Sequence, residues 1–299
     1  MNLQISRQLV AGWILTLILI LSTYWIENIP PKYTEFFEGD LALSYSVHDT
    51  VPYKYVIIYC YVVPTILLCL FVIVCRPKDA SVWVHDILYL ASRSYAVSEI
   101  FIVTLKNFIG RPRPCFFELC QYEKVETVLS SGEIVRTFGT FGVLGNVTKC
   151  HGTQHDIFNA FRSFPSGHSA TAANAFVTLT LLFFRFVDSH FAWKQYSTRI
   201  LKVVILLPFV VWCSFIFGSR IFDYRHRPED VIGGIVFGTL ASILVSLVFY
   251  PCFSTTKRIM DTRSKGKNAS FLCSMFYDDV AESLINVYTP VSKPESVIV

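Results

Sequence analysis

The stretch FRSFPSGHSATAANAFVTLTLLFFRFV, residues 161–187, decides how the fold of this chain is interpreted. It opens with a polar motif, Pro165–Ser166–Gly167–His168, and continues as a mostly apolar run, Ser169–Val187. A helix that crosses a bilayer needs roughly 20 predominantly apolar residues. We therefore expect a membrane-spanning helix that carries a polar motif at its start.

Five further apolar runs of similar length lie near Leu9–Ile26, Tyr55–Cys75, Ile87–Leu105, Leu201–Phe217 and Val231–Phe253. The run at 87–105 is the weakest, because Arg93 and Glu99 are costly in lipid and should face other helices. The first run ends in Tyr24–Trp25, an interfacial aromatic pair, and has no small-residue cleavage pattern. We interpret it as a retained span and not as a signal peptide.

The composition agrees with a membrane protein. Of the 299 residues, 53% are hydrophobic and only 16% are charged, and the mean hydropathy is +0.48. Soluble domains contain about a quarter charged residues. The predicted fold class is therefore all-α, a polytopic membrane protein with six transmembrane helices in a bundle, within a domain of residues 1–253. The net charge of +4 is too mild to suggest a nucleic-acid partner.

Lysine and arginine in the short loops predict the orientation of the spans. The segments 76–78, 185–202 and 257–267 are basic and contain few acids. We therefore expect both termini and the polar tail, 254–299, to lie in the cytosol. The loops after the first, third and fifth spans, including the long loop 106–165, then lie outside the cell or in a lumen.

Three polar motifs fall on that outer side. They are KNFIGRPRP (106–114) at the end of the third span, PSGH (165–168) before the fourth, and SRIFDYRHRPED (219–230) between the fifth and sixth. Adding or removing one span between the motifs would place them on opposite sides of the membrane. The six-span topology and a single site at the non-cytosolic face therefore support each other.

The first two motifs suit an anion such as phosphate. Arg113 offers a planar fork for two phosphate oxygens and Lys106 offers a point charge. Ser166 and Gly167 stand at a helix N-terminus, where backbone N–H groups attract anions. His168 beside them could protonate a leaving oxygen. Taken singly, the same residues also fit interfacial cations and a capped helix with a chance histidine.

The third motif adds a histidine with a carboxylate four residues away. We expect Asp230 to hold one nitrogen of His226, because residues four apart share a helix face, and this contact would raise the basicity of the other nitrogen. Arg220 supplies the third cation. Asp230 could instead stabilise a helix dipole, and His226 could be an interfacial histidine. The neighbouring charged residues are predicted to form a solvated rim; they are Asp223, Arg225, Arg227 and Glu229.

Residues of the long loop carry further expectations. Cys115, Cys120 and Cys150 cannot all pair within it; we favour a Cys120–Cys150 disulfide, although sequence alone does not determine connectivity. Asn146–Val147–Thr148 is a glycosylation sequon on the predicted outer side. Asn268–Ala269–Ser270 has the same pattern but falls in the predicted cytosolic tail, where we treat it as chance. No metal-ligand pattern is present in the sequence, so no metal is indicated.

From about Leu9 to Phe253 the chain resembles the type 2 phosphatidic acid phosphatase (PAP2) superfamily, and most of all its animal-type lipid phosphate phosphatases. The resemblance rests on KNFIGRPRP followed by Cys120, on FRSFPSGHS and on SRIFDYRHRPEDV, in order and at matching spacing. It implies that His226 is the nucleophile that forms a phosphohistidine, Asp230 its orienter and His168 the general acid. It assigns phosphate binding to Lys106, Arg113, Ser166, Gly167 and Arg220.

The resemblance further implies a magnesium-independent phosphatase without a cofactor. Its substrates would be membrane lipids: phosphatidate, lysophosphatidate, sphingosine and ceramide phosphates, and diacylglycerol pyrophosphate. One alternative is a polyprenyl-diphosphate or sugar-phosphate phosphatase of the same superfamily. Another is a membrane protein that binds anionic lipid without catalysis.

Location and assembly are less determined by the sequence. The plasma membrane is favoured over an internal membrane. Gly234 and Gly238 could pack helices within or between subunits; we favour packing within the monomer and leave a homo-oligomer open.

Overall fold

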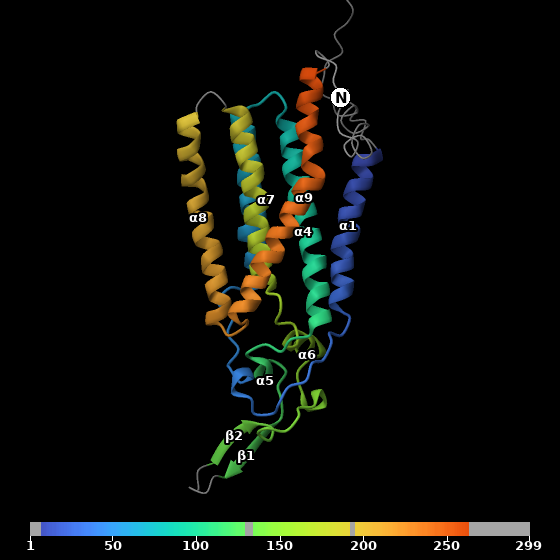
Figure 1. Cartoon of the computed structure of the whole chain (residues 1–299), viewed down its shortest axis with the longest axis vertical. Helices are drawn as coiled ribbons and strands as arrows, with labels where there is room; N and C mark the ends of the chain where they lie inside the picture. Colours follow the sequence, from blue (N-terminus) through green and yellow to red (C-terminus); the bar gives the residue numbers. More distant parts are fainter. Residues whose placement is uncertain (1–6, 129–133, 192–194, 263–299) are drawn as a thin grey trace, which may run out of the picture.

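Six long helical segments stand side by side in the structure, a computed structural model that describes residues 7–128, 134–191 and 195–262 (Figure 1). Six helices in these residues are long and apolar enough to cross a membrane. Five are α1 (Arg7–Glu27), α4 (Ala80–Ile109), α7 (Gly167–His190), α8 (Gln195–Phe222) and α9 (Pro228–Thr262). The second span consists of α2 (Tyr53–Val56), a π-helical segment η2 (Ile57–Val62) and α3 (Val63–Cys75). The expected six-span, mainly helical class is confirmed.

The helices run past the limits expected from hydropathy. α4 begins at Ala80 instead of Ile87, and α9 continues to Thr262 instead of ending at Phe253. Hydropathy marks only the part of a helix that lies in lipid and does not determine where the helix ends, and α9 continues through Pro251 to Thr262. The first residues of the expected tail are therefore helical, and the remainder, 263–299, lies outside the described residues.

Helix α7 lies at the centre of the bundle and packs against α4, α8 and α9. Its closest neighbour is α9, because two glycines of α9 face the α7 backbone. A Cβ on Gly234 would lie 2.4 Å from the carbonyl oxygen of Ser166, and one on Gly238 would lie 2.2 Å from that of Ala170. The GxxxG pair therefore serves packing within the monomer, as expected.

Hydrogen bonds between side chains reinforce the contact of α4, α7 and α9. Asn174 of α7 donates to the carbonyl oxygen of Gly238 at 3.1 Å, and Ser94 of α4 donates to the Asn174 amide oxygen at 3.1 Å. Thr178 and Ser242 bond across α7 and α9 at 3.1 Å. In lipid such bonds hold helices together, because no water competes for the donors.

The two charged residues expected to face other helices do so. The guanidinium of Arg93 donates to the carbonyl oxygen of Gly12 on α1 at 2.5 Å and to the Tyr89 hydroxyl at 2.7 Å. Glu99 accepts a bond of 2.6 Å from Thr171 on α7. Both side chains are buried between helices, which removes the cost of exposing a charge to lipid.

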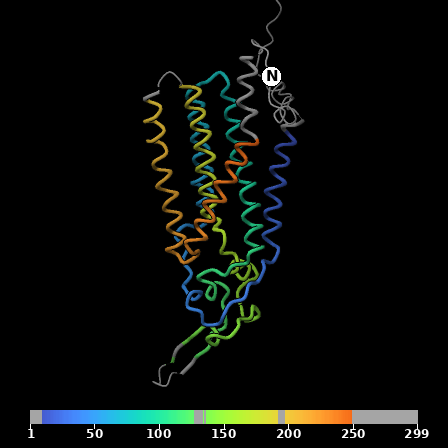
Figure 2. The backbone as a smooth tube through the Cα atoms, viewed as in Figure 1, coloured from blue at the N-terminus to red at the C-terminus, as the bar shows by residue number. Residues whose placement is uncertain are grey.

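The segments 28–52, 110–128 and 134–166 form a cap at the end of the bundle away from the start of α1 (Figure 2). The cap contains η1 (Leu41–Leu43), α5 (Phe116–Leu119), η3 (Val147–Lys149), α6 (Gln154–Ala160) and an antiparallel hairpin of β1 (Lys124–Val128) and β2 (Ile134–Phe138). The all-α prediction did not include this hairpin. Sulfur atoms of Cys120 and Cys150 are joined in a disulfide, the pairing favoured from the sequence.

An aromatic cluster and one buried carboxylate hold the cap together. Phe36 packs against Phe116 and Phe161, with ring centroids 4.6 and 6.0 Å away. Glu38 accepts bonds of 2.7 Å from both Tyr122 and Lys149. Burial acts to raise the pKa of Glu38, but these donors outweigh it and hold the pKa below the ordinary value. The cap thus has its own core, distinct from the apolar interior of the bundle.

Candidate active site

The three motifs meet where the bundle joins the cap. Lys106 lies in the last turn of α4, His168 in the first turn of α7, Arg220 in the last turn of α8, and His226 directly before α9. Gly110 ends α4 with φ of +63°, and a Cβ there would lie 1.8 Å from the carbonyl oxygen of Lys32. Only glycine fits this turn, which directs the rest of the first motif back toward the other two.

Arg113 reaches the imidazole of His226. Its Nη1 lies 3.2 Å from Nε2 of His226, and its Nε and Nη2 donate to the carbonyl and side-chain oxygens of Asn159 at 2.8 and 2.7 Å. Asn159 belongs to α6, which therefore aims the guanidinium. Burial lowers the pKa of Arg113 to about 10, so the group stays charged at neutral pH.

The start of α7 has the geometry of an anion site. Ser166 precedes the helix and its hydroxyl accepts a bond from the N–H of Ser169 at 3.4 Å. The ammonium of Lys106 would lie 2.9 Å from a Cβ on Gly167, so no side chain fits between them. Among the described residues, this ammonium has no hydrogen-bond or ion-pair partner. A cation and a helix N-terminus thus converge on one spot.

The contact expected between His226 and Asp230 differs in the structure. Nδ1 of His226 lies 2.7 Å from the carbonyl oxygen of Ser163, whereas the nearest Asp230 oxygen is 3.9 Å away. The expectation of a direct hydrogen bond was wrong, because it assumed helical geometry at His226, and α9 begins only at Pro228. A carbonyl oxygen only accepts, so Nδ1 carries the proton and Nε2 keeps its lone pair.

Asp230 instead binds Ser163, the residue whose carbonyl oxygen orients His226. Its buried carboxylate accepts from the hydroxyl of Ser163 at 2.6 Å, from the N–H of Arg227 at 2.9 Å and from the guanidinium of Arg111 at 2.8 Å. The Ser163 that bonds Asp230 through its hydroxyl is the one whose carbonyl bonds the histidine. Asp230 therefore acts on His226 through Ser163.

The environment of His226 favours its neutral form. The residue is 3% exposed. Burial lowers its pKa well below the ordinary histidine value, and the charges of Arg113 and Lys106 lower it further. A neutral imidazole with an unprotonated Nε2, here facing the Arg113 guanidinium, has the properties of a nucleophile or a base.

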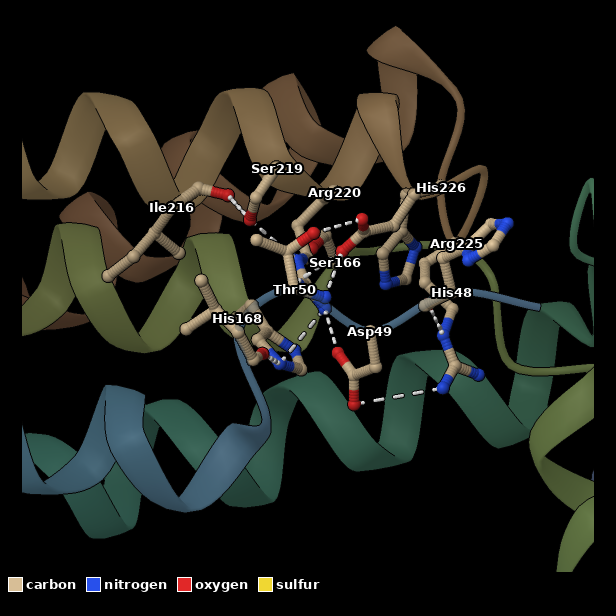
Figure 3. Close-up of polar contacts among 12 residues, drawn as sticks. His48, Asp49, Thr50, Ser166, His168, Ile216, Ser219, Arg220, Arg225 and His226 are labelled. Atoms are coloured by element: carbon tan, nitrogen blue, oxygen red, sulfur yellow. Dashed lines mark hydrogen bonds and ion pairs between the residues drawn. The ribbon is translucent and has the colours of Figure 1, made fainter.

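His168 and Arg220 are in contact with each other (Figure 3). Nε2 of His168 is 3.0 Å from the carbonyl oxygen of Val51 and 3.2 Å from Nη1 of Arg220. Because the carbonyl only accepts, Nε2 is protonated when it makes the first bond. Val51 lies in the segment between α1 and α2. The sequence analysis did not predict that this segment contributes to the site.

The expected solvated rim is only partly correct. Glu229 is exposed, but Asp223 is completely buried. Its carboxylate accepts from Nη2 of Arg220 at 2.9 Å and from the N–H of Thr50 at 2.8 Å. The spacing of three residues between Arg220 and Asp223 was the available signal, because such pairs face each other on a helix.

The sequence analysis gave other contributors no role. Asp49 and Asn159 lie outside the three motifs but contact Arg220 and Arg113, and Ser163, which lies in the quoted stretch FRSFPSGHS, contacts His226. Arg111 of the first motif, to which the sequence analysis gave no role, donates to Asp230 at 2.8 Å. Only the tertiary structure places these groups at the site.

The sequence analysis also singled out Asn146, Cys115 and possible metal ligands. Asn146 is exposed on the cap, and its side-chain oxygen accepts from the N–H of Thr148 at 3.0 Å. Cys115 is a free, buried thiol whose pKa is raised by burial. In the part of the chain that the structure describes, no three histidine, cysteine, aspartate or glutamate side chains gather as a metal-binding group.

Comparison with known proteins places this site in context. The family model for the PAP2 superfamily matches residues 87–254, which include all three motifs. Lipid phosphate phosphatase 2 of Arabidopsis thaliana is 26% identical over 83% of this chain and 79% of its own length. Probable diacylglycerol pyrophosphate phosphatase 1 of Schizosaccharomyces pombe is 30% identical over 79% of both chains. Phospholipid phosphatase 2 of Homo sapiens is 29% identical over 50% of this chain and 46% of its own. No solved structure matches significantly.

Proposed function

Because the chain belongs to the PAP2 superfamily, we propose that it is an integral-membrane phosphatase that hydrolyses phosphate esters of lipids through a phosphohistidine. The observation that carries this proposal is the convergence of Lys106, Arg113 and Arg220 around two histidines. Residues 1–253 would form the phosphatase domain, and the site would face the outside of the cell or a lumen.

In the first step, Nε2 of His226 attacks phosphorus and the phosphorus–oxygen bond to the lipid breaks. His168, protonated on both ring nitrogens in this step, donates its Nε2 proton to the departing alkoxide, so that a neutral lipid alcohol leaves and His168 becomes neutral. The lone pair on Nε2 is available because Nδ1 donates to Ser163. Nη1 of Arg113 lies 3.2 Å from Nε2, so the guanidinium can bind the phosphoryl oxygens as the new nitrogen–phosphorus bond forms.

In the second step, His168, now neutral, takes a proton from water. The hydroxide equivalent attacks the phosphohistidine, the nitrogen–phosphorus bond breaks, and inorganic phosphate leaves. Lys106, Arg113 and Arg220, with the hydroxyl of Ser166 and the N–H of Gly167, stabilise the equatorial oxygens in both steps. Preorganised cations and N–H groups at the site of developing charge are the main source of catalysis in phosphoryl transfer.

The substrate class is supported by the relatives and by the position of the site. The relatives are named for lipid phosphates and for diacylglycerol pyrophosphate. The site lies at the end of six helices suited to a membrane, where a phosphorylated headgroup meets its apolar chains. Phosphatidate, lysophosphatidate, sphingosine and ceramide phosphates, and diacylglycerol pyrophosphate are the proposed substrates. The plasma membrane is the proposed location.

The test is phosphate release by the full chain in detergent, with EDTA present, from phosphatidate, lysophosphatidate and sphingosine 1-phosphate. We expect release by the wild type and its loss by at least about 1,000-fold in His226→Ala, since the nucleophile is removed. Glu35→Gln, an exposed cap residue, serves as the control. No release from any lipid by folded protein would reject the proposal. Release that persists in His226→Ala would reject the phosphohistidine.

A further inference from the structure

The segment between α1 and α2 contacts the site through four consecutive residues, His48 to Val51. Each of them contacts a residue of the second or third motif. Figure 3 shows how this segment, here called the strap, crosses the site. The carbonyl oxygen of His48 accepts from Arg225 at 2.8 Å, and that of Val51 lies 3.0 Å from His168. Thr50 donates to Asp223 through both its N–H and its hydroxyl.

Asp49 makes the most consequential of these contacts. Its Oδ1 accepts from Nη1 of Arg220 at 2.9 Å, and its Oδ2 lies 3.7 Å from Nη2 of Arg225. Nη1 of Arg220 also lies 3.2 Å from Nε2 of His168. A carboxylate oxygen therefore occupies the face of Arg220 that points to the proposed general acid.

The two carboxylates on Arg220 differ in how easily they can move. Asp223 is buried completely and also binds Thr50, so it holds the guanidinium from behind. The side chain of Asp49 is 36% exposed and that of Arg220 is 1% exposed. An incoming phosphate can thus displace Asp49 but not Asp223.

We propose that Asp49 is a competitor built into the site, whose carboxylate takes the place of a phosphate oxygen on Arg220 and withdraws when phosphate binds. This inference rests on the proposed phosphatase function and adds a residue that none of the three motifs contains. Arg225 gives the displaced carboxylate a second cation, so its charge stays compensated in the open state.

The competition has a clear benefit for turnover. Three cations in a largely buried site would hold the product, inorganic phosphate, tightly, because charges attract more strongly where water is excluded. A competing carboxylate weakens the binding of substrate and product alike and so speeds the release of phosphate. Binding that is equal for substrate and transition state does not accelerate the chemical step.

The strap does not depend on Asp49 for its position. Thr50 is bound to Asp223, the carbonyl of Val51 to His168 and that of His48 to Arg225. Removing the charge of Asp49 should therefore leave the strap in place and free one face of Arg220. A positioning role for Asp49 makes the opposite prediction, because Arg220 would then lose its orientation.

The experiment measures the inhibition constants of inorganic phosphate and orthovanadate with Asp49→Asn, using phosphatidate in detergent micelles. We expect both constants and the KM to fall by about two- to fivefold, the effect of one partly exposed ion pair. The kcat should stay constant or decrease as product release slows. In Asp49→Glu, which restores the carboxylate, the inhibition constants and the KM should return toward the wild-type values. In Glu35→Gln these constants should equal those of the wild type.

Higher inhibition constants and a higher KM in Asp49→Asn would overturn the inference and show that Asp49 positions Arg220. Unchanged constants would overturn it as well. Orthovanadate binding is also followed by the shift in melting temperature, which needs no turnover. If the wild type releases no phosphate from any lipid, the proposed function fails, and tighter vanadate binding by Asp49→Asn still decides the role of Asp49. The melting temperature without ligand identifies a variant that does not fold.

Discussion

His226 is surrounded by groups that determine both its proton position and its pKa. The carbonyl oxygen of Ser163 accepts a hydrogen bond from Nδ1–H, while burial, Arg113 and Lys106 oppose a second proton on Nε2. Asp230 contributes only through Ser163 and is itself held by Arg111. At the scale of single residues, Arg111, Asp230 and Ser163 thus act on His226 in succession, and each can be substituted separately.

The lowered pKa of His226 predicts activity that persists to acidic pH. The neutral form is the reactive one, so kcat/KM should fall only as the pH decreases through a pKa below the ordinary value of about 6.5. Arg113→Gln removes a positive charge and should move this acid limb to higher pH by roughly half a unit to one unit. The pH profile of kcat/KM measures it. Arg136→Gln, on the distant hairpin, is the control, and an acid limb unmoved by Arg113→Gln would contradict the electrostatic explanation.

The indirect role of Asp230 predicts a graded pair of variants. Ser163→Ala removes one of three bonds to the carboxylate and leaves the Ser163 carbonyl on His226, so kcat/KM should fall by about tenfold or less. Asp230→Asn removes the charge that pairs the buried Asp230 with the partly buried Arg111 and should cost about 100-fold or more. Steady-state kinetics with phosphatidate would compare them. The reverse order would indicate that Ser163, and not Asp230, dominates the orientation of His226.

At the scale of elements, the close packing of α9 on α7 positions the anion site. Ser166, at the start of α7, donates its N–H to the carbonyl oxygen of Asp230 at 2.9 Å, so the two helix ends are joined directly. Gly234 lies one turn further along α9 against the Ser166 carbonyl. The element pair therefore links the second motif to the third.

Gly234→Ala tests this link. The added methyl group would lie 2.4 Å from a backbone oxygen that cannot rotate away, so the helices must separate. Such overpacking costs about 1–3 kcal/mol, and we expect a lower melting temperature together with at least tenfold lower kcat. Gly218→Ala on α8 is the matched control, because no neighbouring atom lies within 4 Å of its Cβ position. Equal behaviour of the two variants would show that the contact does not position Ser166.

At the scale of the whole molecule, all motif residues lie at the cap end, and α9 and α1 place their outer ends at the opposite end (Figure 1). The cap carries the disulfide and the exposed Asn146. Both belong to the same side of the membrane as the site, whichever compartment that is. The orientation can therefore be determined from the cap alone.

Expression in eukaryotic cells tests the proposed orientation. If the cap faces a lumen or the outside, Asn146 should be glycosylated, and Asn146→Gln should remove the mass decrease seen on treatment with an N-glycosidase. Asn268, in the part of the tail outside the described residues, should stay unmodified in the same sample. A glycan that survives in Asn146→Gln and disappears in Asn268→Gln would reverse the proposed topology.

The amino-acid sequence was sufficient for the six spans, the three motifs and their common side, because these depend on local properties. Apolar length determines which segments enter lipid, and the parity of spans determines which loops share a face. The Cys120–Cys150 pair and the packing of Gly234 and Gly238 within the monomer were also anticipated. For both, spacing along the chain supplied the candidates, and the structure decided between the alternatives.

Only the tertiary structure decided which groups touch. Ser163 and not Asp230 bonds His226, Asn159 aims Arg113, and Asp49 reaches Arg220 from a segment 171 residues away. The short hairpin of the cap and the burial of Asp223 were likewise missed. The physical reason is that hydrogen bonds and ion pairs form over about 3–4 Å, and a one-residue change in where a helix begins moves a side chain farther than that.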